Sequence, residues 1–182
     1  MPFQFSKLSI PDLVLLEPKV FHDSRGYFVE TYKESEFLAQ GINYSFVQDN
    51  RSKSIKGVLR GLHYQLAPKS QGKLVSVIKG RVWDVAVDIR KSSPMFGKWI
   101  GIELSEENNR IFFIPPGFAH GFVALTDEVH LQYKCTNEYS GALDRGIIWN
   151  DPDLAIDWPV SAPIVSQKDS LLPRLKDAEC FE

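Results

Sequence analysis

The chain carries three side chains with the chemistry of a proton-transfer site, His63, Lys73 and His120. A neutral imidazole, with an ordinary pKa of about 6.5, can accept a proton near neutral pH. A lysine ammonium can stabilise the oxyanion that forms beside it. Such a set could remove a proton next to a carbonyl group and hold the resulting enolate. The other histidines, His22 and His130, stand outside any motif, so we expect them to be structural.

His63 and His120 lie in segments that resemble the two signatures of the cupin family, G-x5-H-x-H…E-x6-G and P-x-G-x2-H. In a metal cupin, the histidines and the glutamate of these signatures bind one ion. Here Gln65 replaces the second histidine and Lys73 replaces the glutamate. Because an ammonium group repels a divalent cation, we expect a cupin pocket that has lost its metal.

Two arginines and two tyrosines are candidates for binding. Arg25 and Arg60, if they converge, would suit a diphosphate, because a guanidinium matches phosphate oxygens. Surface ion pairs are the alternative interpretation. Tyr133 and Tyr139 could supply a phenolic acid and a ring that stacks on a base, although aromatic residues in strands more often belong to the core.

The elements that must position these residues are mostly strands, since the hydrophobic period is two. Val82–Ile89 alternates apolar residues with Asp84 and Asp88, which places the two carboxylates on one face. Further strands are expected at Leu74–Ile78, Trp99–Leu104, Ile111–Ile114, Gly121–Leu125 and Val129–Cys135. Turn residues recur at short intervals, which is typical of an all-β sandwich or barrel.

Helices are expected to be few and short. Glu34–Gln40 is the best candidate, with Gly41 placed to end it. Residues 105–109 form either one helical turn or a loop, and one short helix is expected near Asp169. Strict alternation puts His63 and Arg60 on opposite faces of their strand. Either Gly61 marks a bulge or Arg60 reaches the site around an edge.

Length and composition indicate one domain over residues 1–182, with an N-terminal strand segment (about 1–20) and an irregular C-terminal wrap (about 151–182). The formal net charge of −2 gives no basic face for nucleic acid. We expect Cys135 and Cys180 to be free thiols in a reducing compartment. Because neither a signal peptide nor a membrane span is recognisable, we expect a cytoplasmic protein.

Taken in order, seven motifs strongly resemble the dTDP-4-dehydrorhamnose 3,5-epimerase family, over roughly residues 5–172. They are D-x-R-G-x-F at Asp23–Phe28, Q-D-N-x-S at Gln48–Ser52, G-V-L-R-G-L-H at Gly57–His63, G-K-L-V at Gly72–Val75, I-P-x-G-F-A-H-G-F at Ile114–Phe122, Y-K-C-T-x-x-Y at Tyr133–Tyr139 and S-x-K-D at Ser166–Asp169. Any one of these motifs is weak, but the ordered set is specific.

The resemblance implies an all-β cupin jelly roll (double-stranded β-helix) that forms a homodimer and needs no cofactor. It also implies a step in dTDP-L-rhamnose synthesis for cell-surface carbohydrate. The small-molecule substrate would be dTDP-4-dehydro-6-deoxy-D-glucose, inverted at C3 and C5. An apolar N-terminal segment containing Phe3, Phe5, Leu8 and Ile10 could add a strand to a partner's sheet.

The same resemblance assigns roles to individual residues. His63 would be the base and Asp169 its orienting carboxylate, with Tyr133 as the acid on the opposite face of the sugar. Lys73 would hold the C4 oxygen. Further substrate contacts are implied for Arg25, Glu30, Gln48, Asn50, Ser52, Arg60, Asp84, His120, Tyr139, Asp144 and Lys168. Among these, Tyr139 resembles the ring that stacks on thymine, and Asp84 would partner His120.

Three other functions remain open from the sequence. An epimerase that acts only at C3 would use the same base and acid. A non-catalytic sensor of nucleotide sugars would share the pocket but would not need an acid opposite a base. A metal-dependent cupin is disfavoured by Gln65 and Lys73.

Overall fold

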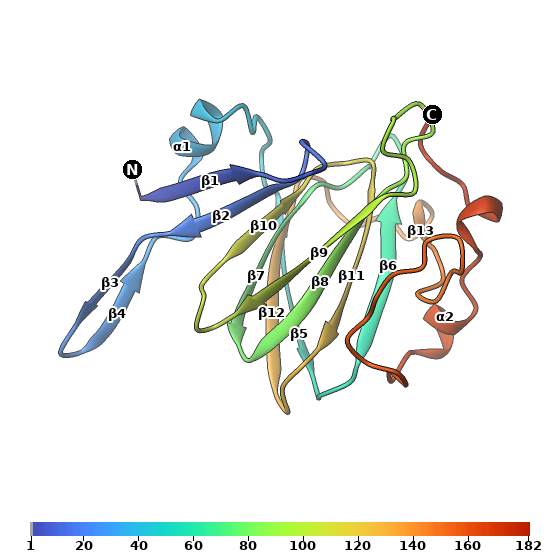
Figure 1. Ribbon diagram of the computed structural model, residues 1–182. Coiled ribbons are helices and arrows are strands. Elements are labelled where there is room, and N and C mark those ends of the chain that lie inside the picture. The colour runs from blue at the N-terminus through green and yellow to red at the C-terminus, as the bar shows by residue number, and fades with distance from the viewer. Residues whose placement is uncertain (1) are drawn as a thin grey trace.

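The alternating pattern produces two antiparallel sheets that face each other in the computed structural model, which describes residues 2–182 (Figure 1). The six-stranded sheet has the order β1-β2-β10-β7-β12-β5, and the five-stranded sheet the order β13-β6-β11-β8-β9. The helices in the described part of the chain are all short. The prediction of an all-β jelly roll with a few short helices is therefore confirmed.

The strands of the six-stranded sheet are β1 (Phe3–Lys7), β2 (Val14–Pro18), β5 (Gln48–Ser54), β7 (Lys73–Lys79), β10 (Ile111–Ile114) and β12 (Val129–Cys135). Those of the five-stranded sheet are β6 (Leu59–Gln65), β8 (Arg81–Asp88), β9 (Trp99–Ser105), β11 (Phe118–Ala124) and β13 (Asp144–Gly146). The helical elements are α1 (Glu34–Ala39), α2 (Gln167–Ser170) and the 3-10 turn η1 (Leu175–Asp177). Residues 106–108 form a turn, so the loop interpretation of 105–109 holds.

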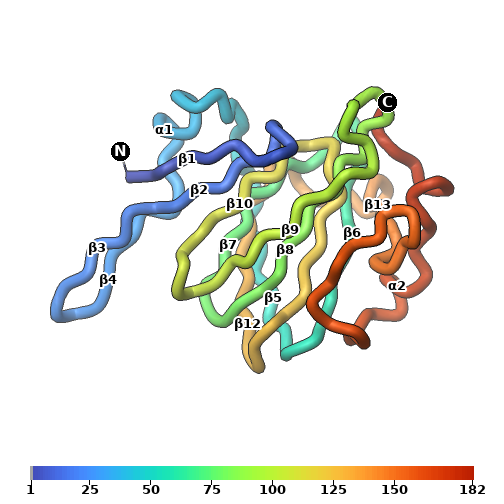
Figure 2. The backbone as a smooth tube through the Cα atoms, viewed as in Figure 1, coloured from blue at the N-terminus to red at the C-terminus, as the bar shows by residue number. Residues whose placement is uncertain are grey.

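Buried apolar side chains form three clusters, one between the two sheets and one on the outer face of each sheet. Between the sheets, side chains such as Val75, Phe112 and Phe122 form the central core. The outer face of the five-stranded sheet is covered by the C-terminal segment through Trp158 and Leu175, which Figure 2 traces in red along that sheet. The alternation of β8 explains this layering, since its even and odd residues serve different cores.

The outer face of the six-stranded sheet is covered by α1. Phe37 of this helix is 1% exposed and packs edge-on against the rings of Phe3 and Phe5. The N-terminal strand β1 pairs with β2 of its own chain, from Phe3 opposite Pro18 to Lys7 opposite Val14. The N-terminal apolar residues thus belong to the core of the chain itself, while β1 remains the edge strand of its sheet.

A hairpin of β3 (Val20–Asp23) and β4 (Gly26–Val29) leaves the two sheets and projects away from them (Figure 1). Within residues 2–182 this hairpin forms a two-stranded sheet of its own. Phe21, Tyr27 and Phe28 on it are 45%, 57% and 66% exposed. These side chains form an apolar surface that nothing in residues 2–182 covers. Isolated two-stranded hairpins are also only marginally stable in water.

A bulge in β6 places Arg60 and His63 on the same side. His120 of β11 is opposite His63, and Phe122 is opposite Arg60, so β6 has one more residue than β11 between these pairs. The extra residue lies at Gly61, and the bulge interpretation is confirmed. Gly61 has φ +134°, and a Cβ there would lie 2.5 Å from the Cα of Gly121. A side chain would prevent this close approach of the two strands.

Among residues 2–182, no helix is both long and apolar enough to cross a membrane.

Candidate active site

A cavity of about 490 Å³ opens between the two sheets. Its walls come from β5, β7 and β12 on one side and from β6 and β11 on the other, and the loop leading to α2 completes them. The lining residues are Ser52, Val58, Leu59, Arg60, His63, Lys73, His120, Phe122, Tyr133, Ile164, Val165, Ser166 and Asp169. The four residues expected to be catalytic therefore all face one cavity.

His63 and Asp169 form a hydrogen-bonded pair. His63 Nε2 lies 2.8 Å from Asp169 Oδ1, and the backbone N–H of Gly61 donates to Oδ2 at 3.3 Å. Burial acts to raise the pKa of Asp169, but hydrogen bonds from His63 and Gly61 outweigh burial and hold the pKa below its ordinary 3.8. An ionised carboxylate only accepts hydrogen bonds, so Nε2 carries the proton. Nδ1 of His63 is left free to act as a base.

Lys73 brings a buried cation across the cavity. It belongs to β7 of the six-stranded sheet and is 9% exposed, and its Nζ donates to the carbonyl oxygen of His63 at 3.3 Å. Burial lowers the pKa of this ammonium, although the carboxylates of Asp84 and Asp144 and the thiol of Cys135 oppose the effect. A lower pKa makes Lys73 a better hydrogen-bond donor to an oxyanion.

His120 stands beside His63 on the neighbouring strand and is held from behind by Asp84. Its Nε2 lies 2.9 Å from each carboxylate oxygen of Asp84, which is fully buried. Burial lowers the pKa of His120, and the nearby charges of Lys73 and His63 act in the same direction against Asp84. His120 is therefore favoured as a neutral donor or acceptor, and the predicted pairing with Asp84 is present in the structure.

Tyr133 comes from β12, in the sheet opposite to the one that carries His63. Burial raises the pKa of its phenol, so it keeps its proton at neutral pH. The Lys73 ammonium lies 5.9 Å from the centre of the Tyr133 ring. A base on one wall and a protonated phenol on the other are thus separated by the width of the cavity.

Arg60 and Ser52 add further polar groups to the lining of the cavity. Arg60 Nε donates to Ser54 Oγ at 3.1 Å, and its Nη2 donates to the Lys53 carbonyl oxygen at 3.1 Å. The Ser52 hydroxyl is buried and has no hydrogen-bond partner among residues 2–182. A buried polar group without a partner is costly, and a ligand that bonds to Ser52 would remove that cost.

Five other predicted contact residues form a hydrogen-bonded cluster at the rim, outside the cavity lining. Gln48 bonds to Asn50 Oδ1 at 3.0 Å and accepts from the Tyr139 N–H at 2.8 Å. The Tyr139 hydroxyl donates to Asp144 at 3.3 Å, and Lys168 donates to the same Asp144 oxygen at 2.6 Å. Tyr139 is 61% exposed, so its side chain is accessible to a stacking partner.

Arg25 and Glu30 do not join the other predicted residues. Arg25 lies at the tip of the projecting hairpin, where it pairs with Asp23 at 2.6 Å and is 88% exposed. Glu30 follows the same hairpin. Arg25 and Arg60 do not converge within one chain, because among the described residues β3 and β4 pair with neither main sheet. For Arg25 the alternative interpretation, a surface ion pair, describes the single chain.

Sequence reasoning missed three residues that hold site residues in place. Ser166 caps α2 by accepting from the Asp169 N–H at 3.0 Å, a spacing that the S-x-K-D motif signals as an N-cap. Ser54 anchors Arg60 and is 4% exposed. The sequence marks Gln65 only as a replacement for a metal-binding histidine, yet its side chain holds the loop that carries Tyr139.

Within residues 2–182, no three His, Cys, Asp or Glu side chains gather in a way that could hold a metal ion. Cys135 and Cys180 are both free thiols, the first buried and the second half-buried.

Comparison with known proteins gives a consistent result. A family profile described as dTDP-4-dehydrorhamnose 3,5-epimerase matches residues 7–177. The dTDP-4-dehydrorhamnose 3,5-epimerase of Shigella flexneri is 55% identical over 176 residues, which span 96% of this chain and 97% of that protein.

Solved structures agree with the sequence match. The crystal structure of dTDP-4-dehydrorhamnose 3,5-epimerase from Sulfolobus tokodaii has a TM-score of 0.94 at 50% identity, with 100% of each chain covered. The dTDP-6-deoxy-D-glucose-3,5-epimerase of Legionella pneumophila, solved in complex with dTDP-4-keto-L-rhamnose, has a TM-score of 0.93 at 47% identity. That comparison covers 96% of this chain and 94% of the other.

Proposed function

Because this chain belongs to the dTDP-4-dehydrorhamnose 3,5-epimerase family and is an isomerase, we propose that it inverts both C3 and C5 of dTDP-4-dehydro-6-deoxy-D-glucose. The product would be dTDP-4-dehydro-L-rhamnose. The observation that carries this proposal is the His63–Asp169 pair on one wall of the cavity and Tyr133 on the other. Inversion requires a proton to leave one face of a carbon and to return to the other.

His63 Nδ1 removes the proton. C3 and C5 both lie next to the C4 ketone, so a proton on either carbon is acidic enough for an imidazole base that is fixed near it. The imidazolium that forms is stabilised by the Asp169 carboxylate at 2.8 Å. Because the Asp169 pKa is held below its ordinary value, the carboxylate stays ionised and keeps the imidazole in the productive tautomer.

Lys73 stabilises the negative charge that moves to the C4 oxygen. Its ammonium is buried and points from the six-stranded sheet towards His63, where a sugar between the walls would present its ketone. One cation can serve both inversions because both share the C4 oxygen. His120, backed by Asp84, supplies a second polar group to the sugar beside it.

Tyr133 returns a proton to the opposite face of the carbon. Its phenol is protonated at neutral pH because burial raises its pKa. The electrons of the enolate form the new C–H bond. The phenolate then takes a proton from solvent and the His63 imidazolium gives its proton to solvent, so both groups are restored before the next inversion. The cycle then consumes no cofactor and leaves substrate and product with the same composition.

The nucleotide part would lie along the polar rim. Ser52 and Arg60 face the diphosphate, and the ring of Tyr139 stacks on thymine, which is worth about 1–3 kcal/mol per base. The Legionella relative was solved with a dTDP-sugar bound, which supports this class of ligand.

We further propose a homodimer in which Arg25 and Glu30 serve the cavity of the second copy. Two observations support this. The hairpin carries Arg25 away from its own cavity, and the apolar side chains of Phe21, Tyr27 and Phe28 are exposed until another surface covers them. A symmetric exchange of hairpins would satisfy both conditions at two equivalent sites.

Deuterium exchange tests the reaction. The protein is incubated with dTDP-4-dehydro-6-deoxy-D-glucose in D2O, with and without EDTA, and the sugar is read by NMR. We expect label at both C3 and C5 with inversion, undiminished by EDTA. The His63→Ala variant should lose exchange at both carbons while keeping its fold by circular dichroism.

Each alternative function gives a different outcome in that experiment. Label at C3 alone would indicate a C3 epimerase. No label, with binding of the nucleotide sugar retained, would indicate a sensor, and loss of label with EDTA would indicate a metal-dependent enzyme. Exchange retained at either carbon in His63→Ala would remove His63 from the role of sole base.

A further inference from the structure

We propose that Gln65 is a positioning residue for nucleotide binding, which acts by fixing the loop that displays Tyr139. This inference rests on the proposed function, because it assumes that the Tyr139 ring stacks on the base of a dTDP-sugar. Gln65 is the last residue of β6 and is 2% exposed, so its amide must find its hydrogen bonds within the protein.

The Gln65 side chain is bonded on both of its polar atoms. Its Nε2 donates to the carbonyl oxygens of Lys69 and Glu138, the second at 3.1 Å. Its Oε1 accepts from the N–H of Ser140 at 2.8 Å. One buried amide therefore ties together two loops, residues 66–72 and residues 136–143, and uses both of its donors to do so.

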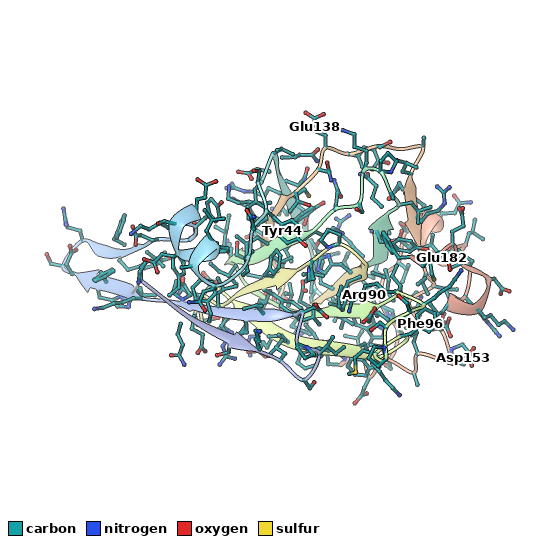
Figure 3. The ribbon with its side chains drawn as sticks, turned by 90° about the horizontal axis from the view of Figure 1, so that it is seen from above. Tyr44, Arg90, Phe96, Glu138, Asp153 and Glu182 are labelled. Carbon is teal, nitrogen blue, oxygen red and sulfur yellow. The ribbon has the colours of Figure 1, made fainter. Side chains whose placement is uncertain are left out.

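These bonds fall on either side of Tyr139. Gln65 holds the carbonyl of Glu138 and the N–H of Ser140, while the N–H of Tyr139 itself donates to Gln48 Oε1 at 2.8 Å. Glu138 lies at the periphery, where its side chain points away from the sheets (Figure 3). The backbone around Tyr139 is thus held from the inside by two glutamine side chains, although the loop itself is exposed.

The Tyr139 side chain is fixed at its other end by Asp144. The Tyr139 hydroxyl donates to Asp144 at 3.3 Å, and Asp144 is opposite Gln65 in the pairing of β13 with β6. Tyr139 is therefore held at its backbone and at its hydroxyl while the residue stays 61% exposed. A stacking partner that is already in place costs less conformational entropy when the ligand binds.

Gln65 occupies the position where a metal cupin carries its second histidine. The three hydrogen bonds of its side chain account for an amide in place of an imidazole. An amide offers two donors and one acceptor in fixed directions, which matches two carbonyls and one N–H. An imidazole has only two ring nitrogens and could not serve all three groups. In this chain the side chain at that position therefore organises the loops around Tyr139.

The test is a double-mutant cycle on binding of dTDP, measured by calorimetry on the full chain. We expect Gln65→Leu and Tyr139→Ala each to raise the Kd for dTDP about tenfold. Because Gln65 acts through Tyr139, Gln65→Leu should add less than about twofold when Tyr139 is already alanine. Independent, multiplicative losses would overturn the proposal.

Two controls separate positioning from general damage. Inorganic pyrophosphate should bind Gln65→Leu as it binds the wild type, because Arg60 and Ser52 are untouched; an equal loss for pyrophosphate would overturn the proposal. Gln132→Leu, the same change on the outer side of β12, should leave the Kd for dTDP unchanged. If Gln65→Leu does not fold, Gln65→Asn replaces it, since it keeps an amide that cannot reach the loop.

The proposed function and this inference fail differently. A wild-type protein that does not bind dTDP would overturn both. A wild-type protein that binds dTDP and labels C3 and C5, with additive effects of Gln65 and Tyr139, would overturn only the role of Gln65.

Discussion

Burial acts against the charged forms of both Lys73 and Asp169. The pKa of each residue is lowered, but this favours the charged form of Asp169 and disfavours that of Lys73. Asp169 receives hydrogen bonds from His63 and Gly61, which overcome burial and lower its pKa. Lys73 lies near acidic groups and a thiol, but these do not overcome burial, and its pKa is also lowered. The carboxylate therefore stays ionised beside the base, while the ammonium becomes a stronger donor to a new oxyanion.

Tyr133→Phe separates proton removal from proton return. The change deletes one oxygen from the wall opposite His63 and keeps the ring in place. We expect the rate of inversion to fall by about 10²–10⁴-fold, the usual contribution of general acid catalysis. Deuterium exchange without inversion should persist, because His63 can still remove and replace a proton on its own face. Both quantities are read by NMR in D2O.

Tyr64→Phe is the matched control for this prediction. Tyr64 is buried on the outer side of β6, where its hydroxyl donates to the Glu179 carbonyl oxygen at 2.6 Å. Its loss should lower stability without changing the ratio of exchange to inversion. Inversion at the wild-type rate in Tyr133→Phe would show that another group returns the proton.

At the scale of the element, the bulge of β6 places Arg60 and His63 on the same face of the strand, although regular alternation would put them on opposite faces. Gly61 makes this possible because its positive φ and missing side chain allow contact with Gly121. The Gly61 N–H also donates to Asp169, so the bulge orients the partner of the base.

Gly61→Ala should lower both stability and activity. A Cβ at this position would lie 2.5 Å from the Gly121 Cα, and overpacking of this kind costs roughly 1–3 kcal/mol. Strand separation would also move His63, so kcat should fall even in the folded protein. Urea unfolding and steady-state rates measure the two effects.

Gly41→Ala provides the comparison for Gly61→Ala. Gly41 follows α1 with φ +78° and has open space where a Cβ would be. In Gly41→Ala the free energy of unfolding should fall only by the cost of a positive φ, about 1–2 kcal/mol, and kcat should stay at the wild-type value. An equal fall in kcat for both variants would show that the bulge has no special role in positioning His63.

Six of the strands could be predicted from the sequence because alternation encodes them, and His63, Lys73 and His120 could be placed in one pocket because local motifs mark them. Val129–Cys135 is the clearest case, since its predicted bounds match β12. The bulge could not be decided, because a glycine in a strand is compatible with several local geometries. The place of Arg25 could not be predicted either, since nothing in Val20–Val29 specifies which sheet a hairpin joins.

At the scale of the whole molecule, the projecting hairpin predicts that two inactive variants restore each other. One variant carries Arg25→Ala and keeps His63, and the other carries His63→Ala and keeps Arg25. If hairpins are exchanged, a mixed dimer contains one complete site. Random mixing should then recover about one-quarter of wild-type activity, since half of the dimers are mixed and half of their sites are complete.

The oligomeric state is measured directly, and a second mixture of variants serves as the control. Size-exclusion chromatography with light scattering should give twice the mass of the chain, which is 20.7 kDa. Mixing His63→Ala with Asp169→Asn is the control, because both changes lie in one cavity and no arrangement of hairpins completes a site. Recovery in the control, or none in the test, would contradict the exchange of hairpins.

Stability should decline in two stages as the pH falls. The pKa of His120 is lower in the folded protein than its ordinary 6.5, so the unfolded chain takes up a proton first. The contribution of His120 to the free energy of unfolding is fully present above pH 6.5 and is lost as the pH falls towards the folded pKa. Each proton of difference costs about 1.4 kcal/mol per pH unit.

The second stage begins where the aspartates titrate. Hydrogen bonds from Arg90 overcome burial and lower the pKa of Asp88, and Asp169 is lowered through His63, so both stay ionised in the fold below their ordinary 3.8. Stability should fall further below that pH as the unfolded chain binds these protons. Urea titrations followed by tryptophan fluorescence measure both stages. His120→Gln should abolish the first stage alone, and a wild-type curve that stays flat from pH 7 to pH 3 would contradict the assignment of these buried groups.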